Sequence, residues 1–297
     1  MRALVTGGAG FIGSALVDKL ILRGHEVTVI DNHSARSNNK FYSNPKAYNY
    51  KLDICDYEGT RGLYKGIDCV FHLAAESRLQ LAIENPIEAV EKNAVGTCTV
   101  LQCAREAGVD RVLYSSTSSA YGMNNSPSVE TQPDDCLNPY SVSKVAGEKL
   151  CKMYTDLYGL KTIIFRYFNV FGDRSPTIGQ YAPVIGVFQR QHAAGEPLTV
   201  VGTGKQRRDF IHVDDVVSAN TVAASTNLSD DKYGMVYNVG SGDNISIIEI
   251  ADIISERREF IPTRTGEVNS TLANIDRITS TFDWKPTIKT RDWVRSQ

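Results

Sequence analysis

The sequence has no excess of charge of either sign and no long apolar run. Its 297 residues include 32 Lys and Arg and 34 Asp and Glu, which leaves a formal net charge of −2. A protein that binds nucleic acid or a membrane surface needs a basic face or run, so we expect neither partner. No apolar run approaches the roughly 18 residues of a membrane-spanning helix, and the first ten residues lack the features of a signal peptide. We therefore expect a cytoplasmic protein.

Cysteine is also sparse. Six cysteines are spread over the chain, with no C-x-x-C pair and no Cys/His spacing suited to zinc. We expect reduced thiols and no metal site. The 42 % hydrophobic content excludes a disordered chain. At about 150 residues per domain, the length fits one large domain or two smaller ones.

Short apolar runs alternate with helix-like segments in the N-terminal half. The pattern predicts strands at Arg2–Thr6, Val27–Ile30, Cys69–Leu73, Arg111–Ser115 and Lys161–Arg166, and helices at Phe11–Leu22, Ile87–Ala107 and Ser141–Tyr158. This alternation is typical of an α/β fold, a Rossmann-like doubly wound parallel sheet with helices on both faces.

After residue 170 the elements become shorter and are separated by glycine, proline and polar residues. We expect a smaller, partly interleaved C-terminal α/β lobe, which gives a nucleotide domain over 1–170 and a second lobe over 171–297. Segments near 210–240, namely Phe210–Ala224 and Val236–Val239, are expected to return to the sheet.

A glycine-rich motif stands between the first predicted strand and the first predicted helix. Glycines 7, 10 and 13 suit a tight turn, close approach of the backbone to a pyrophosphate, and helix–strand packing. The following helix N-terminus would face the phosphates of a dinucleotide. Asp31, at the end of the second predicted strand, is placed to accept hydrogen bonds from ribose hydroxyls, which favours NAD over NADP. Arg36 weakens that preference, and a glycine-rich turn beside a solvated Asp is the alternative.

Tyr140 and Lys144 are spaced to share one face of a predicted helix. A tyrosine has a pKa near 10 and is a poor base at neutral pH. A nearby ammonium group and a positively charged nicotinamide would favour the phenolate and lower that pKa. Lys144 would also hold the nicotinamide ribose. The pair alone is a frequent chance match, but the upstream glycine motif and Asn138-Pro139 directly before it favour a catalytic pair.

Further motifs resemble the short-chain dehydrogenase/reductase superfamily. Asp53-Ile54 resembles its adenine-contacting pair, His72–Ala75 its H-x-A-A turn, and Asn93–Thr97 the N-x-x-G-T start of its central helix. The resemblance implies that NAD contacts Gly7, Gly10, Phe11, Ile12, Gly13, Asp31, Asn32, Asp53, Ile54, Leu73, Ala74, Ala75, Asn93, Ser115, Tyr140, Lys144 and Tyr167.

The segment Tyr114–Gly122 resembles the S-S-[ST]-x-x-x-Y-G stretch of the extended members of that superfamily. The resemblance implies Thr117 as the catalytic hydroxyl that acts with Tyr140 and Lys144. It would hydrogen-bond the substrate oxygen. Ser116 and Ser118 are the neighbouring alternatives.

Three motifs of the second lobe resemble nucleotide-sugar epimerases and dehydratases. They are Arg166–Gly172 (R-x-x-N-V-[YF]-G), Arg207–Asp215 (R-D-[FY]-[IV]-x-V-x-D) and Arg264–Glu267 (R-x-G-[DE]). The resemblance implies that the substrate is bound by Thr117, Asn169, Val184, Arg208, Arg264, Glu267 and Thr271. The two arginines would hold the diphosphate, a task that suits a planar guanidinium, and Glu267 would hold the nucleoside ribose.

The subgroup resembled is that of the UDP-hexose 4-epimerases, which implies an NAD-dependent isomerase with a transient 4-keto sugar. A 4,6-dehydratase or a UDP-glucuronate decarboxylase needs a carboxylate after the catalytic hydroxyl, but Ser118 and Ser119 follow Thr117. The turn His72–Ser77 nevertheless resembles the dehydratase version. A UDP-glucuronate epimerase stays open, and a non-catalytic NAD-binding sensor is disfavoured because such proteins tend to lose the Tyr/Lys pair.

Two segments indicate which sugar the substrate carries, and one pair of helices indicates how copies of the chain assemble. Thr271 matches the position where a bulky residue narrows the sugar pocket in the family, and a small residue there leaves room for a 2-acetamido group. Residues 180–185 resemble the same segment of N-acetylhexosamine and hexuronate epimerases. We therefore expect a UDP-hexose or a UDP-N-acetylhexosamine. The predicted helices Ile87–Ala107 and Ser141–Tyr158 resemble those of a four-helix interface, which implies a homodimer.

Overall fold

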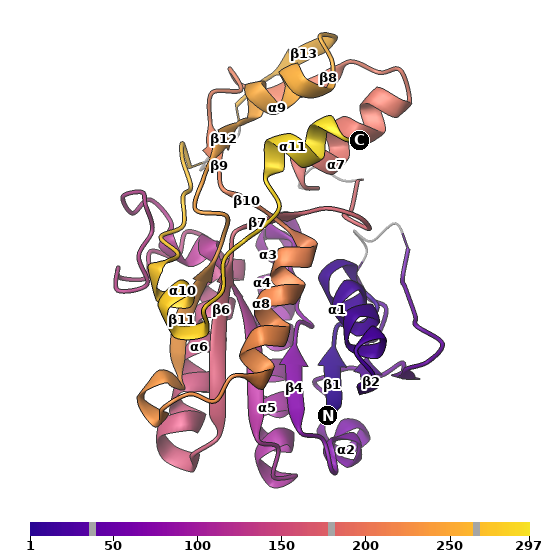
Figure 1. Cartoon of the computed structure of the whole chain (residues 1–297), viewed down its shortest axis with the longest axis vertical. Coiled ribbons are helices and arrows are strands. Elements are labelled where there is room, and N and C mark those ends of the chain that lie inside the picture. Colours follow the sequence, from indigo (N-terminus) through magenta and orange to yellow (C-terminus); the bar gives the residue numbers. More distant parts are fainter. Residues whose placement is uncertain (36–39, 178–181, 264–267) are drawn as a thin grey trace.

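A seven-stranded parallel sheet forms the centre of the computed structural model, which describes residues 1–35, 40–177, 182–263 and 268–297 (Figure 1). Its strand order is β11-β6-β5-β4-β1-β2-β3, and every neighbouring pair runs parallel. The strands are β1 (Arg2–Thr6), β2 (Glu26–Ile30), β3 (Tyr48–Tyr50), β4 (Cys69–His72), β5 (Arg111–Thr117), β6 (Lys161–Tyr167) and β11 (Met235–Val239). The order reverses between β1 and β4, and in open α/β sheets ligands bind at the carboxyl ends of strands beside such a reversal.

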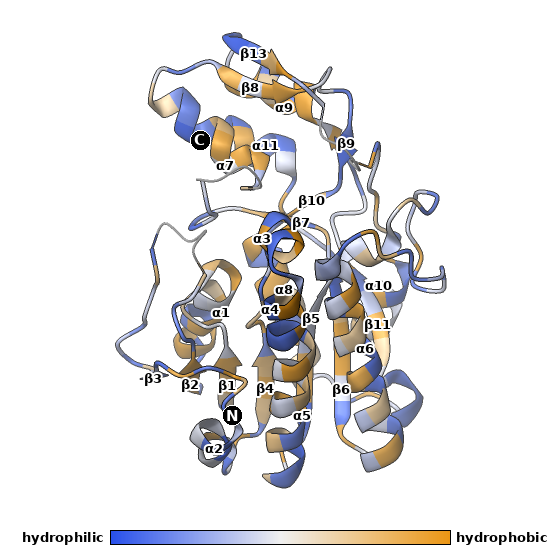
Figure 2. Cartoon of the chain, turned by 180° about the vertical axis from the view of Figure 1, so that it is seen from behind, coloured by the Kyte–Doolittle hydropathy of each residue, from blue (hydrophilic) through white to orange (hydrophobic). Residues whose placement is uncertain are grey.

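Helices cover both faces of the sheet. On one face α1 (Phe11–Leu22), α8 (Val213–Ser225) and α10 (Asp276–Phe282) share a core with Val5 and Phe71. On the other face α5 (Gly96–Glu106) and α6 (Pro139–Tyr158) share a core with Leu4 and Val70 (Figure 2). Successive residues of β1 and β4 enter opposite cores because side chains alternate along a strand. The predicted doubly wound α/β class is confirmed.

Helix α6 begins and ends at residues whose chemistry suits those positions. Asn138 accepts a hydrogen bond from the backbone N–H of Ser141, and Pro139 is the first helical residue. Gly159 ends the helix with φ +71°, a conformation that glycine adopts without strain. The shorter helices near α6 are α3 (Leu79–Glu84) and α4 (Pro86–Val90), and α2 (Tyr57–Thr60) precedes β4.

A smaller lobe lies beyond the carboxyl ends of the sheet strands (Figure 1). Its strands form three pairs, β7 (Asn169–Phe171) with β10 (Phe210–His212), β8 (Leu198–Val201) with β13 (Arg258–Ile261), and β9 (Arg207–Arg208) with β12 (Ile245–Ser246). Its helices α7 (Val184–Ala193), α9 (Ile247–Ile254) and α11 (Thr290–Arg295) pack around a separate apolar core that includes Phe188 and Ile250.

The elements that the sequence predicts are all present, with two differences. The predicted helix over 87–107 is divided by a wider π-helical turn at Glu91–Val95 between α4 and α5. Of the segments expected to return to the sheet, only β11 pairs with it, beside β6. Phe210–His212 pairs with β7 instead, and α8 packs on the sheet face. Within the described ranges, no helix combines the length and apolar character needed to cross a membrane.

Candidate active site

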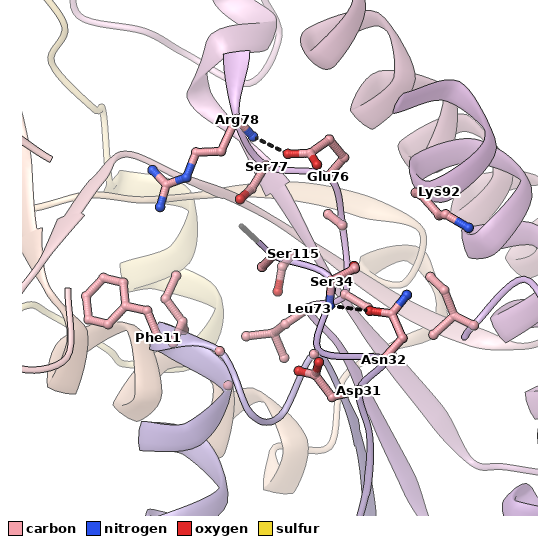
Figure 3. A pocket seen from close by; sticks show the side chains of 18 of the residues that line it. Phe11, Asp31, Asn32, Ser34, Leu73, Glu76, Ser77, Arg78, Lys92 and Ser115 are labelled. Carbon is pink, nitrogen blue, oxygen red and sulfur yellow. Dashed lines mark hydrogen bonds between the residues drawn. The ribbon is translucent and has the colours of Figure 1, made fainter. Parts of the chain in front are cut away.

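A cavity of about 440 Å³ opens at the carboxyl ends of β1, β2, β4 and β5 (Figure 3). It lies where the strand order reverses. Every predicted cofactor residue except Asn93 lines it, and these residues come from segments far apart in the sequence. The sequence-predicted dinucleotide site therefore corresponds to one continuous cavity.

The glycine-rich loop leaves no room for side chains at two of its glycines. Gly7 has φ +70°, and a Cβ there would lie 2.7 Å from the backbone nitrogen of Ala74. A Cβ on Gly13 would overlap the carbonyl oxygen of Gly7. The loop, β4 and the first turn of α1 thus approach one another at backbone distance, which forms the cradle that a pyrophosphate requires.

We expect Gly13→Ala to weaken NAD binding by about 5- to 150-fold, because overpacking a tight contact costs about 1–3 kcal/mol. Isothermal titration of the cofactor-stripped protein with NAD measures the effect. Gly62→Ala is the matched control, because a Cβ there meets nothing within 4 Å. Equal affinity in the two variants would contradict the assignment of this loop.

The adenosine end of the cavity carries two oriented carboxylates. Asp31 accepts hydrogen bonds from the backbone N–H groups of Ala9 (3.0 Å) and His33 (2.8 Å), so its position is fixed before any ribose arrives. Asp53 pairs with Lys92 at 2.9 Å. Burial acts to raise the pKa of Asp53, but hydrogen bonds from the Cys55 backbone, Lys92 and Asn32 outweigh it and lower that pKa.

The opposite end of the cavity holds Tyr140 and Lys144, one helical turn apart on α6. The Lys144 side chain is buried, and its Nζ lies 4.2 Å from the ring centroid of Tyr114. Burial lowers the pKa of Lys144 to about 7, although Glu148 acts in the opposite direction. Near neutral pH this lysine can therefore both hold and release a proton.

Burial raises the pKa of Tyr140. The Thr117 hydroxyl and the positive charge of Arg78 act in the opposite direction and lower it. The sequence pointed to Lys144 as the cation that favours the phenolate. In the protein alone that ammonium lies over the Tyr114 ring and is only partly protonated at neutral pH. Arg78, which the sequence reading did not single out, is the cation that acts on Tyr140.

Thr117 ends β5 and lies beside Tyr140. Its hydroxyl accepts a hydrogen bond from the backbone N–H of Ser119 at 3.1 Å and acts to lower the pKa of Tyr140. The neighbouring Ser116 hydroxyl donates to Glu148 at 2.5 Å and is thereby engaged. The catalytic role of Thr117 stays a prediction.

A buried ion pair lies beneath the catalytic end of the cavity. Arg166 on β6 donates to Glu148 on α6 through Nε (2.8 Å) and Nη2 (2.6 Å), and Nη2 also reaches Asp134 at 2.5 Å. The Arg166 guanidinium lies over the Tyr121 ring at 4.7 Å. Together with Ser116, this network ties the end of β5 and β6 to the helix that carries Tyr140.

Asn93 lies behind the cavity wall and is fully buried. Its Oδ1 accepts from the Glu76 backbone N–H at 2.8 Å, and its Nδ2 donates to the Glu76 carbonyl at 3.0 Å and to the Ser143 hydroxyl at 2.9 Å. Asn93 thus joins the turn after β4 to α6. A direct contact with a cofactor stays a prediction.

Of the substrate residues predicted in the second lobe, the four that the structure describes, Asn169, Val184, Arg208 and Thr271, are not among the residues that line the cavity. Asn169 donates to the Asp209 carbonyl (2.8 Å) and to the Thr271 hydroxyl (3.3 Å). Val184 begins α7, and Arg208 in β9 donates to the Arg207 carbonyl at 2.9 Å. Neighbours of two of them, Val170 and Pro183, line the cavity. Arg264 and Glu267 lie outside the described residues.

Within the part of the chain that the structure describes, no three His, Cys, Asp or Glu side chains are grouped so that they could hold a metal ion. The described cavity is lined instead by glycines, hydroxyls, amides and a few charged groups. These groups suit the phosphates, ribose hydroxyls and sugar hydroxyls of organic ligands.

Comparison with protein families and curated proteins gives a consistent result. The model of the NAD dependent epimerase/dehydratase family matches residues 3–240. UDP-glucose 4-epimerase of Mycolicibacterium smegmatis is 34 % identical over 97 % of this chain and 94 % of its own length. UDP-N-acetyl-alpha-D-glucosaminuronate decarboxylase of Bacillus cytotoxicus is 39 % identical over 86 % of this chain and 79 % of its own.

Solved structures agree with that match. UDP-glucose 4-epimerase of Thermotoga maritima with UDP-glucose superposes with a TM-score of 0.92 at 30 % identity, and covers 99 % of this chain and 96 % of that one. MoeE5 in complex with UDP-glucuronic acid and NAD superposes with a TM-score of 0.89 at 29 % identity, over 100 % of this chain and 97 % of that one. The similarity thus extends over the whole chain and includes enzymes of more than one reaction.

Proposed function

The chain belongs to the NAD-dependent epimerase/dehydratase family, and we propose that it is an NAD-dependent 4-epimerase of a UDP-hexose or UDP-N-acetylhexosamine. The observation that carries the proposal is the place of Tyr140 and Lys144 in the wall of the same cavity that the glycine-rich loop lines. The residues after Thr117 are Ser118 and Ser119, so the carboxylates that other reactions of the family need there are missing.

The residues of the cavity fit NAD along its length. The glycine cradle suits the pyrophosphate, Asp31 the adenosine ribose, and Lys144 the nicotinamide ribose. When bound, NAD supplies reversible acceptance of a hydride from the sugar C4.

The chain's own residues then handle the proton and the geometry. Tyr140 removes the proton of the sugar 4-hydroxyl at its Oη, and Thr117 holds that sugar oxygen and connects it to Tyr140. Arg78 and the cofactor's positive charge favour the phenolate that this step requires. After the 4-keto sugar has turned its opposite face toward the cofactor, the proton returns to the same sugar oxygen. One residue can therefore serve both halves of an epimerisation.

A 4,6-dehydratase is the second candidate, and Glu76 is the observation that favours it. Glu76 lines the cavity, and burial raises the pKa of its carboxyl group, the direction that favours a group able to carry a proton. The reaction needs both an acid and a base near C5 and C6, however. The two residues after Thr117 are serines and supply neither.

Product analysis separates these candidates. Incubation of the purified protein with UDP-glucose and, in parallel, UDP-N-acetylglucosamine is expected to give the C4 epimer without net release of NADH, as measured by anion-exchange chromatography. A 4-keto-6-deoxy sugar would overturn the assignment, as would release of carbon dioxide from UDP-glucuronate supplied as a third substrate. If the protein turned over UDP-glucose but not UDP-N-acetylglucosamine, the result would contradict the proposal that the small Thr271 leaves room for an acetamido group.

We also propose that two copies of the chain form a homodimer through α4 and α6, which contact each other on one side of the sheet (Figure 2). These helices and the π-helical turn between α4 and α5 expose apolar side chains, among them Ile87 (80 % exposed) and Leu157 (66 %). Val90, Val95 and Met153 are exposed on the same group of helices. Exposed apolar side chains on helices that contact each other suit a self-complementary interface.

The variant with both Ile87→Arg and Leu157→Arg is expected to be a monomer, because each arginine would bury an unpaired charge in the interface. Multi-angle light scattering of the NAD-loaded protein measures the mass, which should be twice the chain mass for the unmodified protein. Leu22→Arg is the control, since Leu22 is 81 % exposed on α1, away from the interface. A monomeric unmodified protein would contradict the proposed homodimer.

A further inference from the structure

A carboxylate with no exposed surface, that of Asp209, stands between β9 and β10. Figure 1 shows β10 between the central sheet and the helices of the smaller lobe. The Oδ1 atom of Asp209 accepts hydrogen bonds from the backbone N–H and the hydroxyl of Ser241, both at 2.7 Å. Its Oδ2 atom accepts from the backbone N–H groups of Gly242 (3.1 Å) and Ala273 (2.9 Å). One side chain therefore joins two segments that lie apart in the sequence.

The backbone of Asp209 contacts two of the predicted substrate residues. Its carbonyl oxygen accepts from the backbone N–H of Asn169 at 3.1 Å and from the side-chain Nδ2 of Asn169 at 2.8 Å. Its N–H donates to the Thr271 hydroxyl at 3.2 Å, and that hydroxyl also accepts from Asn169 Nδ2 at 3.3 Å. Asn169 directly precedes Val170, which lines the cavity. Asp209 thus lies directly behind one part of the cavity wall.

The loop that Asp209 binds reaches the same place. Asn244, at the end of the loop 240–244, donates through Nδ2 to the Ser270 hydroxyl (3.1 Å) and to the Thr271 carbonyl (3.2 Å). A Cβ on Gly240 would lie 2.5 Å from the Cβ of Ala273 and 2.9 Å from Asp209 Oδ2. The loop 240–244 and the segment 270–273 are therefore packed against each other around the carboxylate of Asp209.

We propose that Asp209 is a positioning residue for the UDP-sugar, because its carboxylate fixes the loop 240–244 and the segment 270–273 so that Asn169 and Thr271 are in place before the substrate binds. The proposal rests on the proposed function and deepens it by naming the residue that orders the substrate side of the site. A side chain with no exposed surface cannot itself contact the substrate. It acts through the residues that it supports, and such support lowers the cost of ordering them on binding.

An amide cannot replace the carboxylate of Asp209. The groups that surround the carboxylate are N–H and O–H donors, whereas asparagine has one acceptor oxygen and an NH₂ group that would face such donors. A buried donor left without a partner is destabilising, so one of the two segments is expected to move away. Thr271 would then lose its fixed position, because it belongs to one segment and is bonded by Asn244 of the other.

Asp215 offers a matched control. It is buried in the first turn of α8. Its carboxylate accepts hydrogen bonds from the backbone N–H (3.0 Å) and the hydroxyl (2.9 Å) of Thr287 and from the backbone N–H of Ile288 (3.0 Å). None of these three residues is among those that line the described cavity. Asp215→Asn therefore disrupts a comparable set of bonds without touching the segments around Asp209.

The test compares steady-state kinetics of the NAD-loaded variants with UDP-glucose and with UDP-N-acetylglucosamine. Asp209→Asn is expected to raise KM at least about tenfold while kcat changes less than about threefold, because bonds to a charged group are lost on the binding side. Asp215→Asn should keep KM within about twofold of the unmodified value, because distant sites act independently. Ser241→Ala removes a single donor and should raise KM at least about threefold, which provides the test if Asp209→Asn does not fold.

A binding measurement separates this proposal from the proposed function. In the Tyr140→Phe background, isothermal titration with UDP-glucose should show the same rise in Kd for Asp209→Asn and none for Asp215→Asn. Equal KM and Kd in these two variants would overturn the positioning role, as would a loss confined to kcat or an unchanged KM in Ser241→Ala. A product other than the C4 epimer would remove the proposed function and leave the positioning role intact. Absence of both binding and turnover of UDP-sugars in the unmodified protein would overturn both.

Discussion

Tyr140→Phe is expected to lower kcat by about 100- to 10,000-fold while NAD stays bound, because general acid–base catalysis contributes that much to such reactions. Tyr140 lines the cavity one helical turn from Lys144, and the Thr117 hydroxyl acts to lower its pKa. Phenylalanine fills the same space and removes only the oxygen that takes the proton. The loss should therefore appear in kcat rather than in KM, and the measurement is steady-state epimer formation by chromatography.

A tyrosine far from the cavity provides the control for that result. Tyr48 on β3 is exposed, and Tyr48→Phe removes the same atom without contact with either ligand. We expect its kcat to equal that of the unmodified protein. If Tyr140→Phe retained comparable activity, Tyr140 would not be the base, and the mechanism would have to pass through another group of the cavity.

Glu148→Gln is expected to lower the free energy of unfolding by about 3–5 kcal/mol, because it leaves the buried Arg166 without its main counter-charge. Both carboxylate oxygens of Glu148 are engaged, one by Ser116 and Arg166 Nε, the other by Arg166 Nη2. The glutamine side chain has one acceptor oxygen instead of two, so it can form only some of these hydrogen bonds. Urea unfolding of the NAD-loaded protein, followed by circular dichroism, measures the change.

The same helix offers an exposed ion pair for comparison. Lys152 and Asp156 on α6 are 2.7 Å apart, and both side chains are more than half exposed. Asp156→Asn should cost less than about 1 kcal/mol, as exposed pairs do. Equal losses in the two variants would show that the Glu148–Arg166 pair contributes no more than a surface pair and does not anchor the catalytic end.

Much of the fold could be predicted because its signals are local. The strands and helices of the first half follow from apolar runs of β-branched residues and from helical spacing, and α1 lies at Phe11–Leu22 as predicted. The glycine motif could be recognised because Gly7 and Gly13 each serve a backbone need that other residues cannot meet. Of the segment Phe210–Ala224, α8 packs on the sheet as a helix, whereas Phe210–His212 pairs with β7, a partner that no local pattern specifies.

The site was harder to predict where a side chain contacts residues that lie far away in the sequence. Asn93 lies on the expected helix, yet its amide bonds the turn at Glu76, and this contact depends on packing that no local pattern reveals. Arg78 and Lys92 carry no motif of their own in the sequence reading. Both follow the end of β4, where carboxyl-end turns of a parallel sheet converge, and that position is the signal by which they could have been found.

The direction in which the pKa of Tyr140 shifts also could not be predicted without the three-dimensional structure. Spacing alone places Lys144 on the same helix face as Tyr140, and from this the sequence indicates a lowered tyrosine pKa. The folded protein buries Lys144 and partly buries Tyr140, so that burial raises the pKa of Tyr140 and lowers that of Lys144 to about 7. A helical pattern specifies neighbours along one element, whereas desolvation depends on everything packed against it.

The fate of the hydrogen at C4 tests the central claim most directly. The NAD-loaded protein is incubated in ordinary water with UDP-glucose and, in parallel, UDP-N-acetylglucosamine, each deuterated at C4, and the product is examined by nuclear magnetic resonance. A 4-epimerase through a 4-keto sugar predicts the C4 epimer with the deuterium still at C4. Deuterium at C6 of a 4-keto-6-deoxy sugar, or at no carbon of the epimer, would contradict it.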